Sequence, residues 1–135
     1  MDVQLDKWHK CTVDKDVLKE LSKKSDIKGL QHISVFFGLL ILTGVLSYLT
    51  WGSWWSLLFF LIYGNIFCFS NALWHETGHK TAFKSKFLNE LFYYISCFMA
   101  YFEPTRWRYT HFVHHGNTYS TENPFDHEIE YGNDL

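Results

Sequence analysis

The sequence predicts an all-α integral membrane protein, with two transmembrane helices as a hairpin, an interfacial helix, and cytoplasmic helices that carry histidine clusters. Three observations predict this fold. Two uncharged apolar runs are each long enough to cross a bilayer as a helix. A third apolar run is too short to cross. Lysine and arginine lie on both flanks of the paired runs and are absent from the turn between them.

Residues 1–30 are predicted to form a polar, cytoplasmic N-terminal arm. Seven of the 12 basic residues of the chain lie here, interleaved with acidic residues. Val17, Leu18 and Leu21 have helix-like spacing, which predicts a short amphipathic helix within residues 14–25. The charged leader is too long for a secretory signal peptide.

Residues 31–135 are predicted to form one membrane domain. Its two spanning runs cover about residues 33–50 and 54–73, and a Trp-Gly-Ser-Trp-Trp turn joins them. A soluble helical hairpin would need a larger polar shell than this chain supplies. The flank after the second run carries five basic residues, namely Lys80, Lys84, Lys86, Arg106 and Arg108. Both ends of the hairpin are therefore expected in the cytoplasm, with Arg106 and Arg108 at the level of the lipid headgroups.

An interfacial helix is expected over about residues 88–102. Its apolar part, residues 91–102, would cover roughly 18 Å as a helix, whereas the hydrocarbon core is ~30 Å thick. Because this helix does not cross, the segments before and after it stay on the same side of the membrane. Pro104 marks a break before a further helix around residues 106–115, and residues 116–135 are predicted to be a polar loop.

Composition excludes several classes of function. A net charge of −2 and a pI of about 6.4 disfavour a nucleic-acid partner. The three cysteines include no CxxC pair, which disfavours a disulfide framework and a cysteine-based zinc site. Histidine is the unusual residue, because five of the eight histidines lie in two short clusters.

The first histidine cluster is His75 and His79, and the second is His111, His114 and His115. On a helix, His75 and His79 lie one turn apart and only about 40° apart around the axis, so they can reach one metal ion. The three histidines of the second cluster also share one helical face. Five imidazoles exceed the needs of a tetrahedral zinc site, and imidazole suits zinc, copper, nickel and iron alike.

The first cluster alone permits a different interpretation. His75, Glu76 and His79 fit the HExxH pattern of a zinc metalloprotease, in which Glu76 would be the general base. Such a protease needs one further ligand, whereas three more histidines follow here in a compact block. The HExxH match nevertheless keeps a membrane zinc metalloprotease as an alternative.

Three segments together resemble the membrane fatty acid desaturases, the histidine-box family of non-haem di-iron enzymes. They are HETGHKTAF at residues 75–83, FLNE at 87–90 and RWRYTHFVHH at 106–115. That family carries three boxes of the forms HxxxH, HxxHH and HxxHH on the cytoplasmic side of a four-helix bundle. The resemblance covers about residues 33–130 and lacks the third box. It is thus a resemblance to the N-terminal portion only, and we expect this stretch alone to be inactive.

The resemblance implies an oxidoreductase that introduces a double bond into an acyl chain with O₂. Two irons would be held by His75, His79, His111, His114 and His115, and Glu76 would orient a ligand imidazole. The substrate would be an acyl-lipid, an acyl-CoA or an acyl-carrier conjugate. The electron donor would be of the ferredoxin, rubredoxin or cytochrome b5 type. A related membrane hydroxylase of the alkane or carotenoid type, and a membrane fragment without enzymatic activity, are the remaining alternatives.

Overall fold

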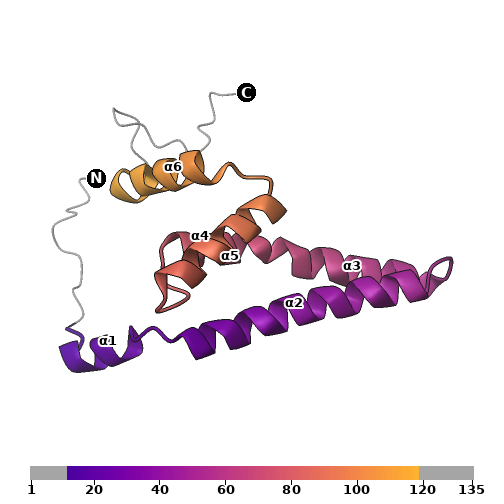
Figure 1. The fold of residues 1–135 in the computed structure, drawn as a ribbon, viewed down its shortest axis with the longest axis horizontal. Coiled ribbons are helices and arrows are strands. Elements are labelled where there is room, and N and C mark those ends of the chain that lie inside the picture. The colour runs from indigo at the N-terminus through magenta and orange to yellow at the C-terminus, as the bar shows by residue number, and fades with distance from the viewer. Residues whose placement is uncertain (1–11, 119–135) are drawn as a thin grey trace, which may run out of the picture.

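The computed structural model describes residues 12–118, and every regular element in that range is a helix (Figure 1). The helices are α1 Lys15–Leu21, α2 Asp26–Leu49, α3 Trp54–Cys68, α4 Ser70–Gly78, α5 Lys86–Met99 and α6 Pro104–Gly116. The all-α prediction is confirmed for this part of the chain. The predictions for the first eleven residues and for the polar tail from residue 119 onward lie outside the described range.

The predicted amphipathic helix is α1. Asp14 caps it, because the carboxylate accepts hydrogen bonds from the backbone N–H groups of Asp16 and Val17. The helix α2 begins at Asp26, well before the predicted start at residue 33. The Ser25 hydroxyl accepts from the Lys28 N–H, and this cap starts a helix through polar residues that hydropathy alone does not assign.

Two stretches are long and apolar enough to cross a membrane, Asp26–Leu49 and Trp54–Gly78. The second combines α3 and α4, which are almost continuous and are interrupted only at Phe69. α2 and α3 lie side by side after a turn in which Gly52 has a φ of 83° (Figure 1). The Ser56 hydroxyl joins them by donating to the Ser47 carbonyl at 3.0 Å.

Helix α5 starts and ends slightly earlier than the predicted interfacial helix. Both α4 and α5 end in a Schellman motif, with Lys80 (φ 59°) and Tyr101 (φ 58°) in the left-handed conformation that glycine usually supplies. Pro104 occupies the first turn of α6, and the Glu103 carboxylate caps that turn through the N–H groups of Thr105 and Arg106.

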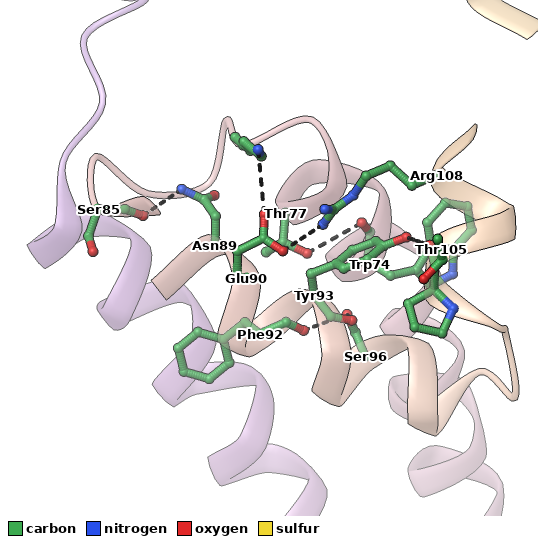
Figure 2. A network of polar contacts seen from close by, with 12 residues as sticks. Trp74, Thr77, Ser85, Asn89, Glu90, Phe92, Tyr93, Ser96, Thr105 and Arg108 are labelled. Atoms are coloured by element: carbon green, nitrogen blue, oxygen red, sulfur yellow. Dashed lines mark hydrogen bonds and ion pairs between the residues drawn. The ribbon is translucent and has the colours of Figure 1, made fainter. Parts of the chain in front are cut away.

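The small core of the described chain lies where α4, α5 and α6 meet. Trp74, Tyr93 and Cys97 are buried together, and Trp107 packs against them. Asn89 holds the segment between α4 and α5. Its amide donates to the Phe83 carbonyl at 2.9 Å, and to the Ser85 carbonyl at 2.7 Å (Figure 2). In Figure 1, α4 and α5 lie between α2 and α6. α5 thus connects the two segments that carry the histidines.

Candidate metal centre

The histidines of interest come from two helices that the chain brings together. His75 lies in the last turns of α4, and His79 is the residue that caps its end. His111 and His115 lie one turn apart on α6. Each pair has the i, i+4 spacing that places two side chains on one helical face. The non-consecutive helices α4 and α6 thus present these two faces to each other.

Four imidazoles converge between α4 and α6. Each of His75, His79, His111 and His115 offers a ring nitrogen, and these four nitrogens all lie within 4.8 Å of one another. Three of the nitrogens form a nearly equilateral triangle. The Nε2 atom of His79 is 3.0 Å from that of His111, and the Nε2 atom of His115 is 3.1 Å from each of them.

The triangle fits a bound ion. Imidazole nitrogens lie ~2.0–2.1 Å from metals such as zinc. Two nitrogens at a right angle around such an ion are roughly 3.0 Å apart, and at a tetrahedral angle roughly 3.4 Å apart. Separations of 3.0 and 3.1 Å are therefore short enough for these three nitrogens to share one ion.

Two tryptophans hold the histidine rings in place. Trp74 stacks on His75 with 18° between the ring planes, and Trp107 stacks on His111 with 23° between them. The two indoles also pack edge to face against each other. His111 is only 5% exposed, so this packing leaves its ring few alternative orientations.

The electrostatics favour a neutral imidazole at His79. Partial burial lowers the pKa of His79 below its ordinary value of 6.5, and the neighbouring rings of His75 and His115 lower it further. A histidine binds metal through an unprotonated nitrogen, so a lowered pKa keeps His79 ready to bind at neutral pH.

The remaining predicted site residues lie close by. The ring of His114 is stacked at 5.9 Å from that of His111 and lies 5.5 Å from that of His115, but His114 is not one of the four converging residues. Glu76 lies on the wall of a shallow groove that also contains His32 and Leu73, between α2 and the α3–α4 helix. Its predicted role in orienting an imidazole stays a prediction.

Sequence reasoning missed the residues that support the site from α5. Asn89 is 1% exposed, and Glu90 pairs with both Arg108 and Lys80. Burial alone would raise the pKa of the Glu90 carboxyl, but the hydrogen bond and charge of Arg108 and the charge of Lys80 outweigh it and lower the pKa. The Arg108 side chain pairs with Glu90, and its expected place at headgroup level stays a prediction. The available signal was the FLNE segment itself, a polar pair just ahead of an apolar run.

Comparison with known proteins gives one match. The model of the family described as fatty acid desaturase matches residues 49–130, a stretch that contains both histidine clusters. No characterised protein and no solved structure matches the chain significantly. The family match covers more than half of the sequence and agrees with the convergence of histidines from two helices. The chain belongs to the fatty acid desaturase family.

Proposed function

We propose that this protein acts as a membrane-bound, O₂-dependent di-iron desaturase that introduces a double bond into an acyl chain. The observation that carries the proposal is the convergence of four imidazole nitrogens from α4 and α6 within 4.8 Å. Family membership supports an oxidoreductase role for that site. Two irons bound there would supply the power to remove hydrogen from an unactivated C–H bond, given O₂ and two electrons from a donor protein.

The five predicted ligands divide between the two irons in this proposal. In this proposal His75, His79, His111 and His115 hold one iron, because one nitrogen of each lies within 4.8 Å of the other three. We assign His114 to the second iron, because its ring lies beside this group without belonging to it. The second iron takes its other ligands from outside these five residues. Trp74 and Trp107 keep the first iron's imidazoles oriented.

The proposed topology places this site at the cytoplasmic surface of a multi-pass protein. Asp26–Leu49 and Trp54–Gly78 would cross the bilayer as a hairpin, and α5 would lie along the interface. Support comes from the basic residues at both ends of the hairpin and their absence from the turn at residues 51–55. A ferredoxin, rubredoxin or cytochrome b5-type donor would reach the irons from that side. The acyl group would arrive on a lipid, on CoA or on a carrier protein.

The geometry favours this proposal over the zinc metalloprotease. A protease of the HExxH type needs three protein ligands around a tetrahedral zinc with an open position. Here two histidines from each cluster converge, so the second cluster, which the HExxH pattern does not include, contributes two of the four nitrogens. A related hydroxylase would use the same residues, so the product must separate these two reactions.

The test is expression of the chain in iron-supplied cells, followed by metal and lipid analysis. We expect purified protein to contain iron in excess of zinc. We expect cell lipids to contain acyl chains lighter by two hydrogens only where the remaining ligands of the second iron are supplied as well, whereas residues 1–135 alone should form no product. Acyl chains heavier by one oxygen would identify a hydroxylase instead. The variant His111→Ala is the control, because His111 belongs to the group of four. Stoichiometric zinc with peptide cleavage would overturn the proposal.

A further inference from the structure

A charged network links the two histidine clusters through a helix that supplies none of the five histidines. Glu90 lies on α5. One of its carboxylate oxygens, Oε2, accepts a hydrogen bond from Arg108 Nη2 at 3.0 Å, and the other, Oε1, lies 3.5 Å from Lys80 Nζ (Figure 2). Lys80 directly follows His79, and Arg108 lies one helical turn before His111. A single carboxylate therefore contacts the ends of both metal-binding segments.

The Arg108 side chain is held in this position from a second direction. Its guanidinium carbon lies 4.1 Å from the centre of the Tyr93 ring. Tyr93 is 1% exposed, and its hydroxyl donates to the Pro104 carbonyl at 2.5 Å in the first turn of α6. α5 therefore holds α6 both through Tyr93 and through Glu90.

Tyr93 also packs closely on the end of α4. A methyl group at Gly78 would lie 3.2 Å from a Tyr93 ring carbon, so glycine permits this close approach one residue before His79. α5 thus contacts both partner segments within one helical turn, from Glu90 to Tyr93. Neither contact involves a histidine.

The Glu90 carboxylate is the charged partner of Arg108 in this arrangement. The Arg108 side chain is 25% exposed, and within residues 12–118 its Nε atom is buried without a hydrogen-bond partner. Removing the negative charge of Glu90 would leave this guanidinium poorly compensated and would free it to leave the Tyr93 ring. α6 would then lose a contact that orients it toward α4.

We propose that Glu90 is a positioning residue that holds the two histidine clusters at metal-binding distance. It acts through Arg108 and Lys80 and is not itself a ligand. This inference rests on the proposed function, because it assigns Glu90 a role in assembling that same centre. The amide of glutamine keeps the size of Glu90 and removes its charge, so Glu90→Gln tests the role with little change in packing.

The experiment compares Glu90→Gln with Glu20→Gln, a matched change at an exposed residue of α1. The full chain in detergent is titrated with Co²⁺, a visible-absorbing probe for imidazole sites. Hydrogen exchange of the α6 amides is measured on the metal-free chain. We expect Glu90→Gln to weaken Co²⁺ binding ~10-fold or more and to speed α6 exchange, with Glu20→Gln like the unmodified protein.

A double-mutant comparison identifies the partner through which Glu90 acts. The combined effect of Glu90→Gln and Arg108→Gln on Co²⁺ affinity should be smaller than the sum of the single effects, because both remove the same contact. α6 exchange in Glu90→Gln equal to that in Glu20→Gln would overturn the inference. If the unmodified chain binds no Co²⁺, the proposed function fails, whereas α6 exchange still decides the role of Glu90.

Discussion

Within the second histidine cluster, neighbouring residues face different surroundings. His115 offers a nitrogen to the group of four, whereas His114 stacks beside that group. We predict that His115→Ala abolishes stoichiometric metal binding, because it removes one corner of the triangle of nitrogens. His114→Ala should keep the metal ion held by the other four histidines. Metal content of the purified variants, measured by mass spectrometry, checks both outcomes.

His32→Ala is the control for these variants. His32 is exposed on α2 and lies outside the group of four, so its loss should leave the metal content unchanged. If His114→Ala lowers the metal content as much as His115→Ala does, the assignment of His114 to a second iron is wrong.

The lowered pKa of His79 predicts how the metal-free protein responds to acid. The unfolded chain binds a proton at this residue near its ordinary pKa of 6.5, and the folded chain binds it only at lower pH. The contribution to stability is therefore fully present above that ordinary value and is lost as the pH falls through the lowered one. We expect the thermal midpoint in detergent to fall on acidification below about pH 6.5.

The variant His79→Ala provides the comparison for this pH dependence. It should show a shallower fall over the same pH range, because the titrating group is absent. An equal slope in both proteins would show that other groups cause the acid sensitivity. Metal affinity should fall in the same direction, since protons compete for the same nitrogen.

At this scale, the sequence predicted the ligand candidates better than their supports. Histidines spaced i, i+3 or i, i+4 share a helical face wherever the helix lies, so all five histidines of the two clusters were candidates. Spacing alone did not separate His114 from the four that converge. The partner of Glu90 depends on how α5 packs against α6, and spacing within α5 carries no information about that.

At the scale of helices, two glycines of α2 are predicted to respond oppositely to the same substitution. A methyl group at Gly29 would lie 2.6 Å from the Ala82 carbonyl oxygen and from the Phe83 ring, so backbone must move. A methyl group at Gly38 meets nothing within 4 Å. We expect Gly29→Ala to destabilise the protein by ~1–3 kcal/mol. Gly38→Ala should stabilise it by ~1 kcal/mol, because alanine favours the helix.

Thermal unfolding of both variants in the same detergent measures this contrast. Since Gly29 contacts the segment just after His79, its variant should also bind metal more weakly than the Gly38 variant. Equal midpoints for the two variants would show that α2 does not pack on residues 82–83 as the structure has it.

The boundaries of the helices differ from prediction for a physical reason. Hydropathy indicates which part of a chain prefers lipid. The apolar run ends near residue 73, whereas the helical span continues to Gly78. The continuation places His75 on the same helix that is expected to cross the membrane. Likewise α2 starts at Asp26 through capping by Ser25, which apolar runs do not reveal. Helix continuity depends on backbone hydrogen bonds, which a polar side chain does not interrupt.

The two long apolar stretches are little buried within residues 12–118. In the two candidate spans, only 17% and 6% of the most apolar windows are buried inside the described chain. In water, such surfaces would associate with one another. Contact with lipid, or packing against further helices, would remove this apolar surface from water. The all-helical class and the two long apolar helices could be predicted from the sequence, because two long uncharged runs can satisfy their backbone hydrogen bonds as helices.

The final prediction concerns how the whole chain sits in the bilayer. α5 has 14 residues, which as a helix span roughly 21 Å, less than the ~30 Å hydrocarbon core. Positions before and after α5 should therefore face the same compartment, opposite to the turn between α2 and α3. We use Lys84, Tyr109 and Ser53 as reporters for these three places, since all are exposed. Each is changed to cysteine in a chain whose three native cysteines are replaced.

Labelling with a membrane-impermeant maleimide then reads the topology. Lys84→Cys and Tyr109→Cys should react together in inside-out vesicles, because the basic flanks hold both positions in the cytoplasm. Ser53→Cys should react only in right-side-out vesicles. If Tyr109→Cys instead reacted in the same vesicles as Ser53→Cys, the right-side-out ones, α5 would have to cross the membrane. The two histidine clusters would then lie on opposite sides of the membrane, and α4 and α6 could not share a metal centre. This labelling pattern therefore tests the site as well as the topology.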